Sequence, residues 1–303
     1  MTKKRNLIII AAAIVAIAFA LMSYKAENNK KKDFLDSGVL GYLGMTEEEF
    51  QEGFNELREF ILSSDKKAEL KNDSFIGSVK EHRRNFHFYS SLMALMMDLK
   101  AGRLDEIILP ESVGLYLLSR NSFYRNVQSV ELLESGICFG FREDCKELRQ
   151  KFDKIIVEME ADGTLEKLIN TYVSISSRDP APKRPHKFEA AETLKVVVTG
   201  DMPPIDMFAG DGQPTGYNTA ILAEIGKRLG KNIAFINADA GGRAAALSSG
   251  RADVVFWYRV TQSKIEGPDP LDEFFKDAPD GVILSRPYYS WGREIVIRMK
   301  DGQ

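Results

Sequence analysis

The sequence predicts an α/β fold of two lobes, each a mainly parallel sheet flanked by helices. Three observations carry this prediction. A motif occurs twice, as Leu99-Lys-Ala-Gly-Arg-Leu-Asp105 and as Leu247-Ser-Ser-Gly-Arg-Ala-Asp253, and an apolar run follows each copy. Strand and helix patterns alternate after residue 193, and a proline-rich stretch at 174–192 separates this region from the first half. Each motif copy ends a helical pattern, turns at glycine and enters a buried strand.

Composition narrows the class of protein. The 303 residues leave room for about two domains, and a net charge of −3 is unlike the basic character typical of nucleic-acid binders. The two cysteines, Cys138 and Cys145, are too few for a disulfide framework, so we expect free thiols. With scattered histidines and no phosphate-binding loop, the sequence predicts no metal, no cofactor and no nucleic-acid partner.

The N-terminus has the pattern of an export signal. Lys3-Lys-Arg5 precedes the apolar stretch 7–22, and a polar segment follows. We interpret residues 1–26 as a signal peptide or, alternatively, as a membrane anchor formed by residues 7–22. Both interpretations predict an extracytoplasmic protein, and the second adds membrane association through this segment.

The first half shows mixed helix and strand patterns. Apolar spacing of three and four predicts an amphipathic helix at 46–71, where Thr46 and Glu49 fit a capping box. A strand end and turn are expected at 75–78. Further helices are expected at 92–100, 112–119, 144–160 and 165–172, and strands at 106–109, 127–133 and 137–141.

The second half alternates regularly. Strands are expected at 194–199, 233–236 and 252–257, with helices at 220–229 and 243–249 between them. Short connections between such elements predict a parallel sheet, with ligands beyond the carboxyl ends of its strands. We therefore expect four regions, namely 1–26, a lobe at 27–173 that includes its closing helix, a linker at 174–192, and a lobe at 193–303.

The residues of the second half resemble the first lobe of family 3 extracellular solute-binding proteins, bacterial components of ABC transporters with the periplasmic-binding-protein type II fold. The resemblance lies in the order and spacing of 194–200, Pro204, 211–218, 221–230, 246–253 and 285–289. In the first half, 99–111 is similar to the family's second lobe and 162–169 to its closing helix. Together the resemblance covers about 74–173 and 194–300.

The order of these parts differs from that of a typical member. Second lobe, closing helix, linker and first lobe follow one another here, whereas the family begins with the first lobe. Two explanations stay open. The chain is a circularly permuted module whose lobes pair with each other, or it joins the end of one tandem module to the start of the next.

The resemblance also implies candidate ligand residues. In members that bind amino acids, an Arg in a first-lobe loop clamps the α-carboxylate, because its planar fork makes two parallel charge-assisted bonds. That position falls on Lys264 or Ile265, and Arg259 lies nearby, where it is alternatively a solvated loop charge. The amine-binding Asp of the second lobe falls on Pro110. Its neighbour Glu111 is a candidate, or alternatively a charge that favours the following helix.

The remaining candidates concern the ligand wall. The resemblance places Met202 at one usual aromatic position and Ala240, next to Asp239, at another. Trp257 and Tyr258 add aromatic rings where the family has small residues, although Trp257 alternatively packs in the core. Thr261 is a candidate donor to a carboxylate or a plain loop residue. The expected ligand-binding set is Glu111, Met202, Asp239, Trp257, Tyr258, Arg259, Thr261 and Lys264.

The resemblance favours a non-enzymatic binding protein that holds a small polar solute, such as an amino acid, between two lobes and delivers it to an ABC permease in the membrane. The alternative is a sensor or interaction ectodomain of the same fold with a degenerate ligand site. An enzyme is a third hypothesis, disfavoured because no Ser/His/Asp constellation is present.

Overall fold

The computed structural model describes residues 40–43, 86–89, 91–174, 180–239, 242–262, 274–276 and 281–300. The expected signal or anchor at 1–26, the helix at 46–71, the turn at 75–78 and Lys264 lie outside these residues. No helix in the described part of the chain is both long enough and apolar enough to cross a membrane.

Internal contacts divide the chain into two compact units. Unit 1 comprises Met1–Gly114, Asn121–Glu134 and Gly292–Gln303, and unit 2 comprises Leu115–Arg120 and Ser135–Trp291. The chain passes between the units through three elements, α6 (Glu111–Arg120), β4 (Tyr124–Arg142) and β12 (Tyr289–Met299).

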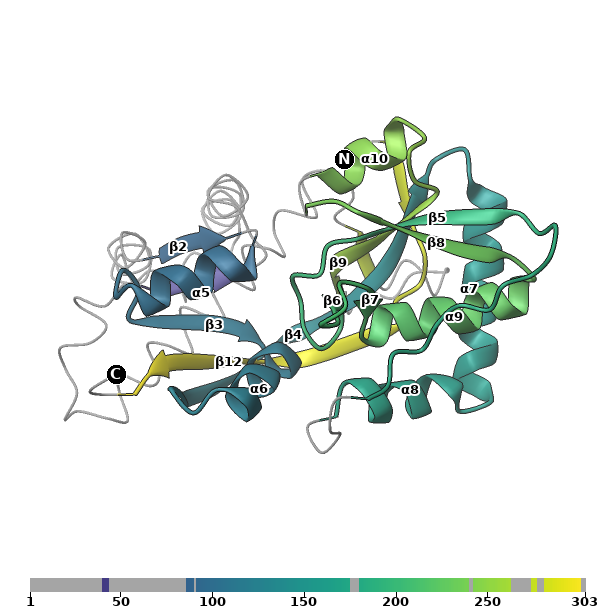
Figure 1. Cartoon of the computed structure of the whole chain (residues 1–303). Helices are drawn as coiled ribbons and strands as arrows, with labels where there is room; N and C mark the ends of the chain where they lie inside the picture. The colour runs from purple at the N-terminus through teal and green to yellow at the C-terminus, as the bar shows by residue number, and fades with distance from the viewer. Residues whose placement is uncertain are drawn as a thin grey trace, which may run out of the picture. The chain divides into compact units, whose positions relative to one another are not determined.

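Unit 1 has a short parallel sheet. Strand β1 (Leu40–Leu43) lies between β2 (Phe86–Tyr89) and β3 (Glu106–Pro110) and runs parallel to both. Strand β12 pairs with β3 in the antiparallel direction, as Figure 1 shows. Helix α5 (Leu92–Lys100) buries three leucines, at positions 92, 95 and 99, because their spacing places them on one helix face. The expected helix at 92–100 and strand at 106–109 are confirmed.

Unit 2 contains the alternating pattern expected from the sequence. Strand β5 (Thr193–Val198) lies between β8 (Asn232–Asn237) and β9 (Val254–Gln262), and all three are parallel. Helices α9 (Tyr217–Leu229) and α10 (Gly242–Ser248) connect them (Figure 1). The hydrophobic strand centres and the glycine that ends each helix determine this order locally. The α/β class is therefore confirmed.

Antiparallel strands extend the parallel core of unit 2. Strand β9 also pairs with β4 and with β10 (Phe274–Lys276), and β4 pairs with β11 (Val282–Leu284). A small hairpin joins β6 (Met207–Phe208) to β7 (Pro214–Thr215). Helices α7 (Lys146–Ala161) and α8 (Thr164–Tyr172) pack together and against α9.

Two sequence expectations are corrected here. The strands expected at 127–133 and 137–141 form one continuous strand, β4. Gly136 does not interrupt this strand, because its missing side chain allows Pro287 to approach closely. A Cβ on Gly136 would lie 3.0 Å from Pro287 Cβ. Residues 258–262, expected to lie in a loop beyond the strand at 252–257, continue β9, because β4 and β10 supply backbone partners there.

Residues 180–192 of the proline-rich stretch form neither helix nor strand, and they are held against unit 2. The Tyr172 hydroxyl donates to the Ala181 carbonyl at 3.1 Å, and the Phe188 N–H donates to Asn232 Oδ1 at 2.8 Å. Since unit 2 includes residues on both sides of this stretch, the unit boundary does not fall at 174–192. The assignment of 27–173 and 193–303 to two lobes stays a prediction.

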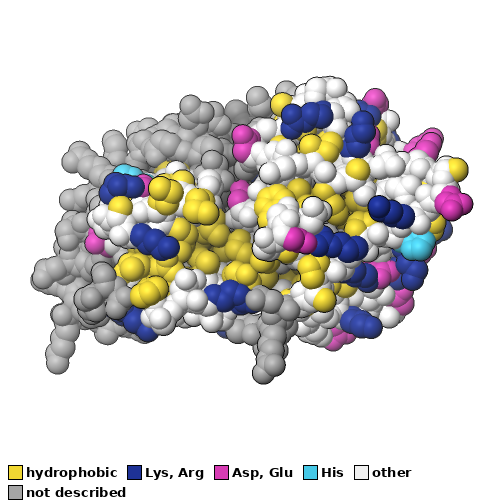
Figure 2. Space-filling model, in the orientation of Figure 1, with side chains coloured by type: hydrophobic (Ala, Val, Ile, Leu, Met, Phe, Trp, Pro, Cys, Tyr) yellow, Lys and Arg dark blue, Asp and Glu magenta, His cyan; other side chains and the backbone are white. Residues whose placement is uncertain are grey.

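On the visible face of unit 2, basic, acidic and hydrophobic side chains are interspersed (Figure 2). No single charge sign dominates this face.

Candidate ligand-binding site

The carboxyl ends of β5, β8 and β9 meet at one edge of the unit 2 sheet, because the three strands are parallel. The segment after β5 contains Thr199, Asp201 and Met202, and the segment after β8 contains Asp239. We call this set the strand-end edge. It is the place where doubly wound α/β sheets bind ligands.

The segment after β5 is tied into a fixed loop. Asp206, which is fully buried, accepts from the Thr199 N–H at 3.0 Å and from the Thr199 hydroxyl at 2.9 Å. The same hydroxyl contacts the Asp201 carboxylate. Backbone bonds of 2.9 Å join Met202 and Asp206 in both directions across a cis Pro203–Pro204 bond. Met202 is held within this loop and is 7% exposed.

Asp239 lies in the connection between β8 and α10. Its side chain is exposed, and Oδ1 accepts from the Gly242 N–H at 2.6 Å. The carboxylate therefore fixes the start of the helix. Asp239 Oδ1 is thus engaged in a hydrogen bond. Asp239 lies at the same edge of the sheet as the loop that holds Met202.

Arg243 is a cation at this edge that the sequence interpretation missed. Its Nη1 donates to the Phe256 carbonyl in β9 at 3.0 Å, which fixes the guanidinium near the strand ends. One feature of the sequence could have indicated Arg243. It lies in the first turn of a predicted helix, where a cation interacts unfavourably with the helix dipole. A basic residue at such a position needs another partner, and here β9 supplies it.

Four candidates lie on β9 itself. Trp257 pairs with Cys138, Tyr258 with Ile137 and Thr261 with Ser135 across the antiparallel ladder. The register shifts between Gly136 and Ile137, so Arg259 is the extra residue of a β-bulge. Bulges are frequent beside functional sites because they redirect side chains. The region of Arg259, which was expected to lie near the carboxylate-binding position, is therefore a strand with a bulge.

The last described candidate, Glu111, belongs to unit 1. It is the first residue of α6, and its carboxylate lies 4.0 Å from Arg293 Nη1. A carboxylate at this position also interacts favourably with the positive end of the helix dipole.

Neither metal nor disulfide chemistry is supported by the described residues. They contain no cluster of three or more His, Cys, Asp or Glu side chains suited to a metal ion. Cys138 is buried and Cys145 is partly buried, and both are free thiols as expected. Burial is the main cause that raises the pKa of Cys145, and its bond to Asp144 adds to the shift.

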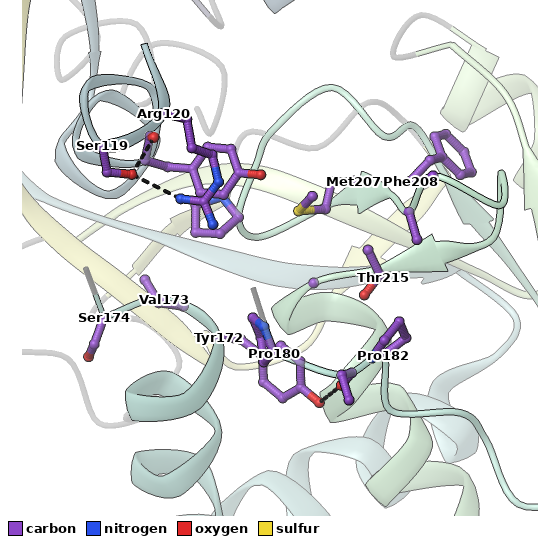
Figure 3. Close-up of a pocket in the computed structure, with 16 residues that line it drawn as sticks. Ser119, Arg120, Tyr172, Val173, Ser174, Pro180, Pro182, Met207, Phe208 and Thr215 are labelled. Carbon is purple, nitrogen blue, oxygen red and sulfur yellow. Dashed lines mark hydrogen bonds between the residues drawn. The ribbon is translucent and has the colours of Figure 1, made fainter. Parts of the chain in front are cut away.

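Unit 2 also holds a pocket of about 350 Å³ (Figure 3). It is lined by the last turn of α6, the end of α8, residues 180–182 and parts of the segment 204–216. None of the eight candidate residues lines it. The pocket and the strand-end edge are therefore separate features of this unit.

Comparison with known proteins gives a family match for part of the chain. Residues 194–266 match the model of bacterial extracellular solute-binding proteins, family 3. This range contains β5, β8 and β9 together with every candidate residue except Glu111. No curated protein matches the chain.

Solved structures give more distant likenesses. The B. pertussis BvgS periplasmic domain is 11% identical with a TM-score of 0.37, covering 91% of this chain and 40% of that one. The PBP AgaA of A. tumefaciens R10, solved with agropinic acid, is 12% identical with a TM-score of 0.37, covering 71% of this chain and 55% of that one. ArgBP of T. maritima is 14% identical with a TM-score of 0.32, covering 73% and 68%.

The family match covers the part of unit 2 that contains the strand-end edge. That match begins at the first residues of β5 and extends past the end of β9. It includes the strands, the connecting helices and the strand-end edge. Over residues 194–266 this chain is thus similar to the bacterial extracellular solute-binding proteins, family 3.

Proposed function

We propose that the chain is an extracytoplasmic solute-binding protein of an ABC-type importer, and that it binds a small polar solute such as an amino acid. The family match over 194–266 supports the binding role. The apolar stretch at 7–22, preceded by lysines, supports a position outside the cytoplasmic membrane, by export or by anchoring. The permease in the membrane is the proposed recipient of the solute.

The observation that carries this proposal is the strand-end edge. Polar side chains that follow two neighbouring parallel strands lie at one edge, and the loop that holds Met202 is fixed by the bonds of Thr199 to Asp206. A rigid loop suits binding because little conformational entropy is lost when the solute arrives.

We assign roles to the candidate residues by chemistry. Arg259 or Lys264 pairs with a carboxylate of the solute, and Asp239 pairs with a positive or hydrogen-bonding group. Trp257, Tyr258 and Met202 contact its less polar parts, and Thr261 donates a hydrogen bond.

Isothermal titration of the full chain with each of the twenty amino acids and a set of small organic acids tests the proposal. At least one solute is expected to bind saturably. Arg259→Ala is then expected to weaken its binding about tenfold, because a charge-assisted pair is lost.

Arg251→Ala is the matched control. Arg251 is exposed and precedes β9 at the opposite end of the strand from the bulge, so its removal leaves solute binding unchanged. Absence of heat with every solute contradicts the proposal. Equal loss in the two variants contradicts the role of Arg259 in solute binding.

A further inference from the structure

The pocket of about 350 Å³ in unit 2 is enclosed by parts of the chain that are far apart in sequence. Its walls are the last turn of α6, the end of α8, the segment 180–182 and the hairpin region 204–216 (Figure 3). All of its lining residues belong to unit 2, and none of them belongs to the strand-end edge. The proposed solute site therefore does not account for this pocket.

The backbone of the pocket walls offers few polar groups to a ligand. Three prolines line the pocket, at positions 180, 182 and 204, and proline has no backbone N–H. Two carbonyls of these walls already accept hydrogen bonds: the Ala181 carbonyl from the Tyr172 hydroxyl at 3.1 Å, and the Pro204 carbonyl from the Tyr217 N–H at 3.1 Å. These walls therefore present mainly hydrocarbon surface to the interior of the pocket.

The side chains of the lining are suited to contact an aromatic ring. Tyr116 and Tyr172 contribute rings, and Met207 contributes a thioether. In Figure 3 the Met207 side chain extends toward Arg120, whereas the Phe208 ring turns away. Aromatic rings pack favourably on one another in offset or edge-to-face geometry, and a methionine sulfur makes favourable contacts with a ring, often at its edge. The lining therefore favours a flat aromatic ligand over a saturated one.

The charges of the lining favour an uncharged ligand. None of the described residues that line the pocket is acidic, so a cation gains no partner there. The cationic residue of the lining is Arg120, which is exposed and engaged by its own helix. Its guanidinium carbon lies 3.9 Å from the centre of the Tyr116 ring, and its Nη1 donates to Ser119 Oγ at 2.9 Å. An exposed cation adds little stability to an ion pair, whereas burial of a charge in the pocket is costly.

Contacts next to the proline wall fasten it to the rest of unit 2. Lys183, which follows this wall in sequence, pairs with Glu224 of α9. Arg184 Nη1 donates to the Pro214 carbonyl at 3.2 Å, and its Nη2 lies 3.2 Å from Asp211 Oδ2. Two opposing walls, the proline segment and the hairpin, are thus joined to each other. A ligand that enters a cavity with fixed walls orders few groups of the protein, which favours binding.

We infer that this pocket is a second binding site, distinct from the strand-end edge, for an uncharged aromatic molecule of about two fused rings. The ring faces lie against the prolines and tyrosines of the lining, and the ring edge contacts Met207. The size follows from the volume, because an apolar cavity of about 150 Å³ is large enough to bind benzene. A volume of about 350 Å³ therefore accommodates two rings, and it lies at the lower end of the range for small-molecule sites.

Titration of the full chain at pH 7 with 2-naphthol tests this inference. The matched ligands are 2-naphthoate, which is anionic, 2-naphthylmethylamine, which is cationic, and decahydro-2-naphthol, whose rings are saturated. We expect 2-naphthol to bind saturably and the two charged ligands to bind at least about tenfold more weakly, because their charge must be buried. The saturated alcohol is expected to bind about threefold more weakly than 2-naphthol, because it lacks the aromatic contacts. Failure of 2-naphthol to bind, or equally tight binding of any of the other three, overturns the inference.

Variants on two different walls locate the binding. Val173 lines the pocket at the end of α8, and Val173→Trp fills the cavity, so 2-naphthol binding is expected to be lost. Met207→Ala, in the hairpin, is expected to weaken that binding about threefold because the sulfur contact is removed. This second variant covers the case in which Val173→Trp fails to fold.

Arg251→Ala, outside the pocket, is the matched control and leaves 2-naphthol binding unchanged. Unchanged binding in both Val173→Trp and Met207→Ala overturns the inference. The proposal for the strand-end edge is then unaffected, because none of its assigned residues lines the pocket.

Discussion

The turn motif that occurs once in each unit has the same local geometry in both. Gly102 in unit 1 and Gly250 in unit 2 each have φ of +69°. The Gly102 N–H donates to the Leu99 carbonyl at 3.2 Å, and the Gly250 N–H to the Leu247 carbonyl at 2.9 Å. Both leucines are buried. The helix end is therefore encoded by the motif itself.

The strands that follow the two turns also have equivalent partners. In unit 1, Ile107 of β3 pairs with Gly41 of β1, and in unit 2, Val255 of β9 pairs with Val197 of β5. Ile107 and Val255 stand at the same distance after the aspartate of their motif copies. Gly41 and Val197 are thus equivalent positions in two parallel sheets.

The packing of these equivalent positions differs. In unit 1 a large residue of the motif, Leu104, lies against Gly41, whose absent side chain leaves the space that it fills. In unit 2 the motif residue is Ala252, and it shares a buried cluster with the larger Val197. In unit 1 the motif residue is large and the residue it packs against is small, whereas in unit 2 the motif residue is small and its neighbour is larger. A shared turn motif therefore does not dictate shared core packing.

A second difference lies one residue earlier on each strand. Unit 1 has Glu106, which is 4% exposed and accepts from Arg298 Nε at 2.8 Å. Unit 2 has the fully buried Val254 at the equivalent position. One unit uses a buried ion pair where the other uses a hydrocarbon side chain.

The largest expected effect comes from breaking that ion pair. Arg298→Met leaves the Glu106 carboxylate buried without its main cation, and we expect a loss of about 3 kcal/mol in the free energy of unfolding. Urea denaturation of the full chain, followed by circular dichroism, measures it.

The control for this variant replaces both partners. Glu106→Leu with Arg298→Met gives unit 1 the apolar solution of Val254, and stability is expected to return to within about 1 kcal/mol of the parent chain. A double variant as unstable as the single one contradicts the comparison of Glu106 with Val254.

The next largest effect is expected at Gly41, the small residue against which Leu104 packs in unit 1. A Cβ on Gly41 would lie 2.4 Å from Leu95 Cδ1 and 2.6 Å from Leu104 Cδ1, so Gly41→Ala is expected to cost about 1–3 kcal/mol. In a double-mutant cycle, Leu104→Ala recovers part of that cost, with a coupling of at least about 0.5 kcal/mol. Strict additivity of the two substitutions contradicts the proposed exchange of volume.

A smaller and equal effect is expected at the two turn glycines. At Gly102 and at Gly250 a Cβ would meet no atom within 4 Å, so Ala is penalised only by the left-handed backbone. Each substitution is expected to cost about 1 kcal/mol. Melting temperatures of the two variants check the match, and costs that differ by more than about 1 kcal/mol show that the turns are not equivalent.

The smallest effect is a pH slope from Glu106. Burial raises its pKa above the ordinary value of 4.5, although Arg298 and Arg125 oppose the shift and Asp105 adds to it. The folded chain therefore holds this proton more tightly than the unfolded chain does. The resulting stability is present below pH 4.5 and is lost as pH rises through the raised pKa.

Glu106→Gln removes this titration. Denaturant unfolding of both chains at a series of pH values is expected to show that the stability of the parent chain falls relative to Glu106→Gln as pH rises through that window. A relative rise contradicts a raised pKa.

The elements that sequence reasoning predicted depend on local patterns. Helix α5 was predicted to the residue because Ser91, its leucine spacing and Gly102 all lie within or next to it. The order β5, α9, β8, α10 and β9 follows from apolar strands and glycine helix ends in the same way. Such features need no distant partner.

The elements that were missed depend on distant partners. Strand β12 carries Arg293, Glu294 and Arg298 within its span, and its polar residues conceal a strand that pairs with β3. The extension of β9 past Phe256 needs β10 and β4. Neither pairing can be predicted from the residue types of the strand alone, because the partner strand lies elsewhere in the sequence.

The site divides in the same way. Met202 and Asp239 became candidates because the family resemblance places them at the ligand wall, and the strand-end edge follows from the parallel order of the strands. Arg243 was missed because its partner is the carbonyl of Phe256, which no side-chain pattern indicates. The pocket of Arg120 was missed because its walls come from four separate segments.

Hydrogen exchange of the full chain, with and without a millimolar mixture of the twenty amino acids, tests the central claim most directly. The account predicts slower amide exchange in 199–202 and 238–242, at the strand-end edge, and no change at 251–253, at the opposite ends of the strands. Exchange that is unchanged in 199–202 and 238–242, or slowed only at 251–253, contradicts solute binding at this edge.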